Sequence, residues 1–204
     1  MERLIKDSGR NSSSDYDQIF KDRQDKGVHW SDLRRWKYLL KYYKSGKIAD
    51  LGCLDSKVPE LIKDQYSYLG IDLAEKALNE MQSKYPQANY LVSDIYDLKS
   101  FGNQFDYVVL GEVIEHLEHP QKAISEAIRI LKYGGILALS TPLNEAIEPG
   151  AVDAERHIWS YTEEDMYKLM GRYGKVKIKI LRSRWFPTYK YCFPQIICWV
   201  KKDV

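Results

Sequence analysis

The middle of the chain alternates short apolar runs with longer amphipathic segments. Apolar runs bounded by Gly, Asp or Ser predict strands, and segments with apolar residues every three or four positions predict helices. The expected strands are 47–52, 66–72, 88–94, 105–111 and 135–141, and the expected helices are 58–64, 74–85 and 120–135. Strands that alternate with helices in this way form a parallel sheet with helices on both faces.

The carboxyl-terminal part has a different pattern. Residues 162–174 predict another helix, and residues 175–185 and 195–202 alternate like two strands joined by a loop that contains prolines. Two consecutive strands of this kind form an antiparallel hairpin. The sequence therefore predicts an α/β fold: a Rossmann-like, doubly wound, mostly parallel seven-stranded sheet with a C-terminal antiparallel β-hairpin.

The residues before the first strand predict a cap outside the sheet. Apolar residues recur at helical spacing in the segment 32–45, whereas residues 1–17 are polar and are expected to be flexible. At 204 residues the chain is long enough for one well-buried domain and short for two. We expect a single domain with a flexible segment 1–17, a helical cap 18–46, a ligand-binding core 47–142 and a substrate-side region 143–204.

Composition narrows the class of protein. Hydrophobic residues make up 44% of the chain and charged residues 29%, which is typical of soluble globular proteins, and no apolar run has the length of a membrane span. The amino terminus has no apolar stretch like that of a secretion signal, and the three cysteines form no CxxC pair. These features favour a cytoplasmic protein with buried thiols and no membrane contact.

The net charge of +2 hides a segregation of charge. Residues 21–47 carry nine Lys and Arg against three Asp and Glu, residues 172–204 carry nine against one, and residues 48–171 carry ten against twenty-one. Such a distribution could hold a cationic ligand centrally and an anionic substrate at the rim, because summed charge steers association. The alternative is that these charges are solvated surface residues without a ligand.

Carboxylates follow the predicted parallel strands at the edge where open α/β sheets bind ligands. Asp50 and Gly52 end the first strand, and a glycine there permits close approach of the backbone. Asp72 follows Asp50 by twenty-two residues, near the offset at which a carboxylate accepts hydrogen bonds from ribose hydroxyls. Asp94 and Glu112 end the next two strands. The pattern indicates a nucleoside-bearing ligand with cationic parts; alternatively, the aspartates only cap helices and turns.

These strand ends resemble the class I S-adenosylmethionine-dependent methyltransferases. Asp50-Leu51-Gly52 resembles the family's D/E-x-G-x-G-x-G turn around the methionine part of the cofactor, but Leu54 and Ser56 stand where that turn has further glycines. The resemblance implies that Asp72 takes the ribose hydroxyls. The cofactor-binding set that it implies is Asp50, Gly52, Cys53, Asp72, Leu73, Asp94, Ile95, Gly111 and Glu112, with Asp94 and Ile95 near the adenine.

The stretch 112–116 adds an E-x-x-E-H motif. A helical turn that begins near Glu112 would place Glu112, Glu115 and His116 on one face, although acidic residues also suit any helix amino terminus. Similar stretches occur in family members that act on small molecules, such as those of quinone biosynthesis, without a metal. In the RNA 3′-terminal 2′-O-methyltransferases the motif holds a divalent metal together with a later histidine, which His157 resembles. The metal stays open; Glu112, Glu115, His116 and His157 would be its ligands.

The resemblance implies an S-adenosylmethionine-dependent enzyme that methylates a hydroxyl or amine of a small-molecule acceptor. His116 is the first candidate for the base that removes a hydroxyl proton, and His157 is the second. One alternative is a divalent-metal-dependent RNA 2′-O-methyltransferase, and another is a non-catalytic binding or scaffold protein. A nicotinamide-dependent oxidoreductase would need G-x-G-x-x-G after the first strand, where this chain has Gly52-Cys53-Leu54-Asp55-Ser56-Lys57.

Overall fold

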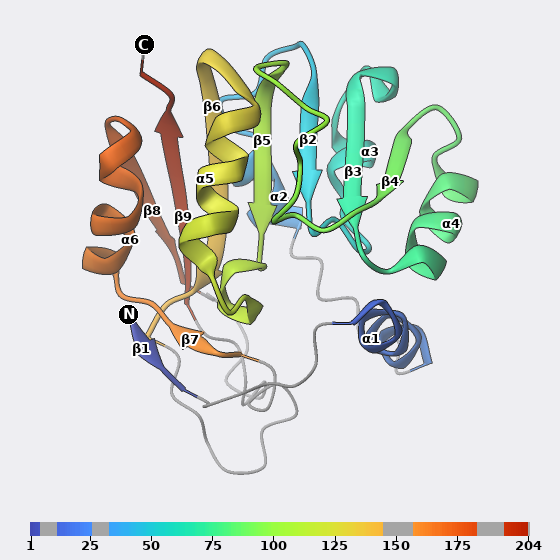
Figure 1. The fold of residues 1–204 in the computed structure, drawn as a ribbon, viewed down its shortest axis with the longest axis horizontal. Helices are drawn as coiled ribbons and strands as arrows, with labels where there is room; N and C mark the ends of the chain where they lie inside the picture. Colours follow the sequence, from blue (N-terminus) through green and yellow to red (C-terminus); the bar gives the residue numbers. More distant parts are fainter. Residues whose placement is uncertain (5–11, 26–32, 145–156, 183–193, 204) are drawn as a thin grey trace.

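A seven-stranded sheet forms the centre of the molecule (Figure 1). The computed structural model describes residues 1–4, 12–25, 33–144, 157–182 and 194–203. The strands of this sheet, in spatial order, are β4 (Asn89–Val92), β3 (Tyr68–Asp72), β2 (Ile48–Leu51), β5 (Phe105–Gly111), β6 (Leu131–Pro142), β9 (Gln195–Lys201) and β8 (Val176–Leu181). β4, β3, β2, β5 and β6 are parallel, and β9 is antiparallel to β6 and β8. The predicted α/β fold with its terminal hairpin is confirmed.

The direction of chain progression reverses at β2. β2 pairs with β3 on one side and with β5 on the other, so the chain crosses the sheet at this point. In open parallel sheets the crevice outside the carboxyl ends at such a reversal is the usual ligand site. The reversal therefore places Asp50 of β2 between the ends of β3 and β5.

Helices cover both faces of the sheet (Figure 1). α5 (Pro120–Ile130) and α6 (Glu163–Met170) pack on one face, and α2 (Leu33–Leu39), α3 (Val58–Leu61) and α4 (Glu75–Lys84) pack on the other. Short 3₁₀ turns lie at η1 (Gln65–Ser67), η2 (Ile114–His116) and η3 (Gly171–Tyr173). None of the described helices combines the length and apolar character that crossing a membrane requires.

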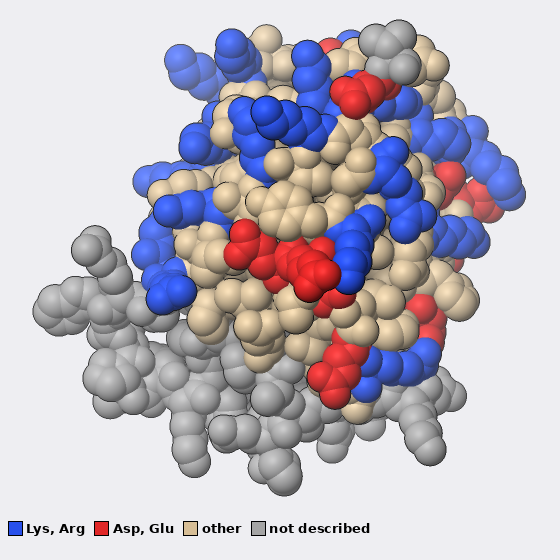
Figure 2. Space-filling model, turned by 90° about the vertical axis from the view of Figure 1, so that its left-hand side faces the viewer, with Lys and Arg blue, Asp and Glu red and all other residues tan. Residues whose placement is uncertain are grey.

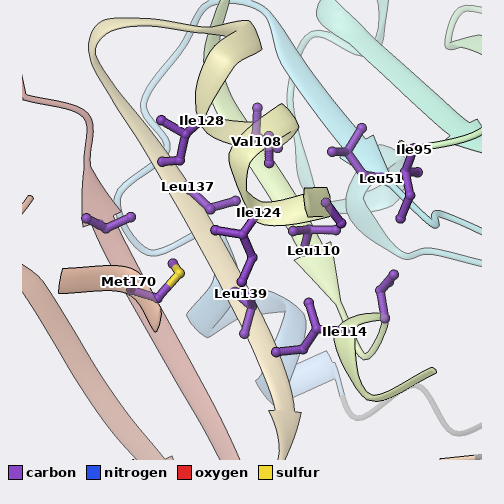
Figure 3. Packing of buried hydrophobic residues seen from close by; sticks show 14 of the residues in the cluster. Leu51, Ile95, Val108, Leu110, Ile114, Ile124, Ile128, Leu137, Leu139 and Met170 are labelled. Atoms are coloured by element: carbon purple, nitrogen blue, oxygen red, sulfur yellow. The ribbon is translucent and has the colours of Figure 1, made fainter. Parts of the chain in front are cut away.

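Alternate residues of the buried strands supply the two cores. In β5, Val108 and Leu110 face the α5 side, whereas Tyr107 and Val109 face the α2 side. Figure 3 shows the α5-side core, where Ile124 and Ile128 of α5 meet side chains of β5 and β6. Burial on both faces explains why these strands read as continuous apolar runs rather than as alternating ones.

The helix predicted over 32–45 is shorter than expected. α2 ends at Leu39, because the Leu39 carbonyl accepts hydrogen bonds from the Tyr107 hydroxyl (2.5 Å) and the Trp199 indole N–H (3.3 Å). The backbone N–H of Tyr43 donates to Leu40 instead. Side chains of the sheet thus take the carbonyl that the helix would need to continue.

Part of the segment 1–17, which the sequence predicts to be flexible, lies in described elements, whereas residues 5–11 lie outside the described residues. β1 (Glu2–Arg3) pairs with β7 (Trp159–Ser160) in a separate two-stranded sheet, and α1 (Ser13–Asp25) packs against α4. Ser12 and Asp15 cap α1 reciprocally, each side chain accepting the backbone N–H of the other. Phe20 is buried against Ala74 and Ala77. The polar composition of this segment is that of a helix with one narrow packed face.

Candidate functional site

The turn after β2 is held open by backbone in the left-handed region. Gly52 has a φ of 70°, and a Cβ added there would lie 2.7 Å from Cγ2 of Val113. The Gly52 N–H donates to the Ile71 carbonyl at 2.8 Å. Leu54 also has a positive φ of 31°. The chain therefore keeps a glycine-like backbone shape where the family motif has another glycine, with local strain at a side chain that disfavours it.

Asp50 lies at the floor of this turn and is almost completely buried. Its Oδ2 accepts a hydrogen bond from the Tyr68 hydroxyl at 3.1 Å, and the Ser56 side chain also hydrogen-bonds to it. Burial raises the pKa of Asp50 to about 7, against these two hydrogen bonds and the attraction of Arg35, which lower it. Ser56, which stands at a position where the family motif has glycine, thus supplies a hydrogen bond to Asp50.

Asp72 ends β3 and organises the backbone around it. Its Oδ2 accepts the N–H of Leu54 and its Oδ1 accepts the N–H of Ala74, both at 2.9 Å. These two bonds fix the position of the Asp72 carboxylate at the end of β3. Tyr16 of α1 lies close by, and burial together with the charge of Asp72 raises the pKa of its hydroxyl. α1 therefore lies beside the Asp72 carboxylate.

An ion pair crosses the end of β5. Arg35 of α2 is 8% exposed, and its Nη1 lies 3.4 Å from Oε1 of Glu112. The side chain of Gln195, at the start of β9, donates to Oε2 of Glu112 at 3.4 Å. The Nε of Arg35 and Oε1 of Glu112 are buried and have no hydrogen-bond partner within the described parts of the chain. Such atoms indicate a place for a polar ligand group.

The E-x-x-E-H stretch is not one helical turn. Glu112 has a left-handed φ of 59°, η2 spans Ile114–His116, and α5 begins only at Pro120. The prediction that Glu112, Glu115 and His116 share one helical face is therefore wrong. Glu112 turns toward Arg35, whereas Glu115 is completely buried and accepts a hydrogen bond from the Thr141 hydroxyl at 3.1 Å. Glu112 and Glu115 point in different directions because the left-handed backbone at Glu112 changes the direction of the chain ahead of η2.

His116 and His157 come together although forty residues separate them. The Ile158 N–H donates to the Glu115 carbonyl at 2.7 Å, and the Trp159 indole N–H donates to the Leu117 carbonyl at 2.8 Å. These bonds bring the two imidazole centroids to 4.6 Å. β1 braces the same segments, since Arg3 pairs with Glu118 at 2.9 Å and stacks on Trp159. The sequence-predicted histidine pair thus forms one compact site.

Glu115 completes this pair as a cluster. One ligating atom from each of Glu115, His116 and His157 lies within 4.8 Å of the others. Burial and the neighbouring charge of Glu112 raise the pKa of Glu115 to about 8. Oε1 of Glu115 is buried without a hydrogen-bond partner among the described residues. The cluster can hold a proton or a cation.

Of the remaining predicted residues, Asp94 is exposed and the others are buried or half-buried. Oδ1 of Asp94 accepts the N–H of Tyr96 at 2.8 Å, the turn-capping arrangement that was the alternative for it. Ile95 is buried, and Leu73 is half-buried at the end of β3. Cys53 is buried, and burial holds the pKa of its thiol well above the usual value. Gly111 packs under the Trp36 ring, where a Cβ would lie 3.1 Å from the indole.

Sequence reasoning missed four residues of the site: Tyr16, Arg35, Thr141 and Gln195. Each reaches the site from an element whose position depends on tertiary packing. The only local signal is at Arg35, a cation on the apolar face of the predicted helix 32–45, next to Trp36. A buried arginine needs an acidic partner, which local sequence does not identify.

Comparisons with known proteins agree with this geometry. The family model described as "Methyltransferase domain" matches residues 49–139. A Mycolicibacterium smegmatis protein named "Probable S-adenosylmethionine-dependent methyltransferase" is 29% identical over 104 residues, covering 50% of this chain and 40% of that protein. The ubiquinone biosynthesis O-methyltransferase of Coxiella burnetii is 29% identical over 123 residues, covering 57% of this chain and 53% of the relative. The chain thus matches about half the length of these curated relatives.

Solved structures share the fold over nearly the whole chain. A SAM-dependent methyltransferase from Thermotoga maritima superposes with a TM-score of 0.71 at 17% identity, covering 92% of this chain and 100% of that one. The N-methyltransferase NodS from Bradyrhizobium japonicum, solved with S-adenosyl-L-homocysteine, gives a TM-score of 0.70 at 14% identity, covering 92% and 98%. The family model, the relatives and the fold, together with the strand-end acids, thus support a class I S-adenosylmethionine-dependent methyltransferase.

Proposed function

We propose that this protein binds S-adenosylmethionine and transfers its methyl group to a hydroxyl, or else an amine, of a small molecule. The observation that carries the proposal is the position of Asp50 and Asp72 at adjacent strand ends, on either side of the Gly52 turn. A positively charged sulfur nucleoside suits these acidic strand ends. When bound, the cofactor supplies an already electrophilic methyl group, so the protein's task is placement and exclusion of water.

The residues present fit the two ends of the cofactor. Asp72, at the end of β3, would accept hydrogen bonds from the ribose hydroxyls, with Ile95 and Asp94 at the adenine side. Asp50 and Glu112 would hold the ammonium of the methionine part. Arg35, whose Nε is buried without a described partner, would hold its carboxylate. Carboxylates would thus face the ammonium of the amino-acid group, and a guanidinium would face its carboxylate.

Proton removal from a hydroxyl acceptor falls to the histidine pair. His116 and His157 are half-buried, which leaves them accessible to an acceptor. Imidazole titrates near neutral pH, so His116 can take the proton as the methyl group is transferred, with His157 beside it as the second candidate. Glu115 lies beside the pair, but its raised pKa leaves the carboxyl largely protonated at neutral pH, so the proton transfer is assigned to the imidazoles alone.

Replacement of His116 by Ala tests this role. Turnover should fall by about 10²- to 10⁴-fold, whereas the dissociation constant for S-adenosylmethionine should stay within twofold. His119→Ala is a matched control, because His119 is exposed at the start of α5. Equal turnover of His116→Ala and the wild type would remove His116 from the mechanism.

The acceptor class follows from transfer assays with tritiated S-adenosylmethionine. The similarity to an O-methyltransferase of ubiquinone biosynthesis supports a phenolic hydroxyl, whereas the likeness to NodS supports an amine only through the fold. We expect methylation of 3,4-dihydroxybenzoate at a higher rate than of histamine. Faster transfer to histamine would replace the hydroxyl by an amine as acceptor, and failure of calorimetry to detect cofactor binding would favour a non-catalytic scaffold.

A second candidate is a divalent-metal-dependent RNA 2′-O-methyltransferase. The cluster of Glu115, His116 and His157 favours it, because one carboxylate and two imidazoles suit Mn²⁺ or Zn²⁺. Glu112 does not join this set, since it pairs with Arg35. The metal-free proposal expects methyl transfer to survive dialysis against EDTA. Loss of transfer on dialysis, restored by Mn²⁺, would favour the second candidate.

A further inference from the structure

Two basic segments that are far apart in the sequence lie side by side. The Trp199 indole N–H of β9 donates to the Leu39 carbonyl of α2 at 3.3 Å, and the Arg34 guanidinium donates to the Arg182 carbonyl at 3.4 Å. Nζ of Lys41 and of Lys177 lie over the Tyr42 ring at 5.3 and 4.7 Å. The helix and the hairpin therefore share one surface. We call it the basic face, and its exposed members are Arg34, Lys37, Lys41, Lys177, Lys179 and Arg182.

The segments that form the basic face carry cations without acidic residues between them. Residues 33–47, 175–182 and 195–202 contain no Asp or Glu. Within the described parts of the chain, Lys37, Lys41, Lys177 and Lys179 make no ion pair, whereas Lys132 and Lys168 do. Figure 2 looks onto this side of the molecule and shows Lys and Arg around a central patch of Asp and Glu. The cations of the basic face attract anions over a distance of about one Debye length.

The cations are arranged in two rows. Lys177 and Lys179 alternate along β8 and face the same side, about 6.6 Å apart along the strand. Arg34, Lys37 and Lys41 recur at intervals of three and four positions, along one side of α2 and the turn after it. β8 and β6 are both antiparallel to β9, so both run in the same direction. Arg182 therefore lies at the sheet edge that carries the strand-end acids.

We propose that the basic face binds single-stranded nucleic acid, which runs along β8 and α2 toward the rim of the site. A polynucleotide carries a negative charge at every unit, so it can use all cations of a straight row at once, whereas an acidic peptide rarely repeats charge so regularly. The half-buried rings of Tyr38 and Tyr42 add aromatic surface between the cations. The proposal is independent of the proposed function, because binding is measured without cofactor or turnover.

A purely structural role for the lysines is the main rival. β8 is the edge strand of the sheet, and lysines on edge strands prevent pairing with other chains. That role accounts for Lys177 and Lys179. It does not account for Lys37 and Lys41, which lie on and just after a helix.

Fluorescence anisotropy with a labelled 20-nucleotide oligouridylate tests the proposal. The test variant carries Lys37→Gln, Lys41→Gln, Lys177→Gln and Lys179→Gln. The control carries the same charge change elsewhere, as Lys63→Gln, Lys84→Gln, Lys99→Gln and Lys168→Gln. We expect the test variant to bind at least about tenfold more weakly. The slope of the logarithm of the binding constant against the logarithm of the salt concentration should be shallower by about 0.7 for each lost phosphate contact. The control should match the wild type.

Each other outcome contradicts the proposal. Equal weakening in both variants would mean diffuse charge attraction, and absence of binding by the wild type would leave only edge protection. Tighter binding of polyglutamate or of anionic lipid vesicles than of the oligonucleotide would identify a different partner. Because the β8 changes could cause aggregation, Lys37→Gln with Lys41→Gln alone is a second variant. This second variant leaves the edge strand intact, and its loss of affinity should be smaller than that of the fourfold variant. Unchanged affinity would overturn the proposal.

Discussion

The pKa of Asp50 makes stability depend on pH. Burial raises this pKa to about 7, whereas an unfolded chain has a value of about 3.9. The folded protein therefore holds a proton that the unfolded chain releases, and this contribution to stability is complete below about pH 4. It is lost as pH rises toward 7, by up to about 1.4 kcal/mol per pH unit. In urea unfolding, the difference in the free energy of unfolding between Asp50→Asn and the wild type should grow from pH 4 to 7. A difference that stays constant over this range would contradict the raised pKa of Asp50.

The same carboxyl should couple cofactor binding to pH. A cationic ligand favours the ionised form of Asp50, so binding must release its proton. Calorimetry should therefore find S-adenosylmethionine bound on the order of tenfold more weakly at pH 6 than at pH 8. Asp50→Asn should bind more weakly overall and lose this dependence on the carboxyl. An unchanged pH dependence in the variant would place the titrating group elsewhere.

Arg35 is predicted to recognise the carboxylate of the cofactor's amino-acid part. Arg35→Gln should weaken S-adenosylmethionine by at least about tenfold, the order expected for loss of a charged hydrogen bond. It should leave methylthioadenosine, which lacks that carboxylate, nearly unaffected. Arg34→Gln is the matched control, since Arg34 is exposed at the neighbouring position of the same helix. Equal weakening of both ligands would show that Arg35 acts through folding alone.

At the scale of single residues, the sequence predicted those whose position depends on the strand pattern. Asp50 and Asp72 follow apolar runs, and parallel pairing brings such ends together. The sequence placed Glu112 correctly at its strand end. Its left-handed backbone conformation, however, excludes it from the helical turn that was expected to begin there. Arg35 and Gln195 come from opposite ends of the chain to meet Glu112. That meeting depends on packing of whole elements, which a local pattern does not contain.

At the scale of elements, the turn after β2 has one position that tolerates no side chain. Gly52→Ala combines a left-handed backbone, which costs about 1–2 kcal/mol for a residue with a Cβ, with a Cβ 2.7 Å from Val113. We expect a lower melting temperature and loss of detectable cofactor binding. Gly102→Ala is the control, because its added Cβ meets no atom within 4 Å. Wild-type binding by Gly52→Ala would show that the turn does not shape the site.

α1 is the element whose role the sequence missed. Phe20 attaches it to Ala74 and Ala77, and Ser13 donates to the Leu73 carbonyl at 2.6 Å. Phe20→Ala should loosen α1, so hydrogen exchange should accelerate in Ser13–Asp25 but not in β2 or β5, and cofactor affinity should fall several-fold. Tyr167→Ala, at an exposed residue of α6, is the control. Unchanged exchange in α1 would contradict its attachment through Phe20. Its few apolar residues explain why periodicity did not reveal it.

At the scale of the molecule, the fold follows from consistent local signals. Apolar runs of strand length alternate with amphipathic helices, and the alternating hairpin at the end adds the antiparallel strands. Segregated charge was also visible in the sequence, but only the packing of α2 on β9 joins the two basic ends in one face. The acidic strand ends and the basic face occupy adjoining parts of the molecule, which suits a cationic cofactor beside an anionic partner.

Isothermal titration of S-adenosylmethionine into the wild type and Asp72→Asn tests the central claim most directly. The account predicts saturable binding at one site per chain, weakened at least about tenfold in the variant, because one carboxylate oxygen loses its charge toward the ribose. The variant keeps one acceptor oxygen for the backbone N–H groups of Leu54 and Ala74 and loses the other, so its melting temperature should fall, and binding is compared at a temperature where both proteins are folded. Absence of binding to the folded wild type at millimolar cofactor, or equal affinity of both proteins, would contradict the claim that these strand ends hold the cofactor.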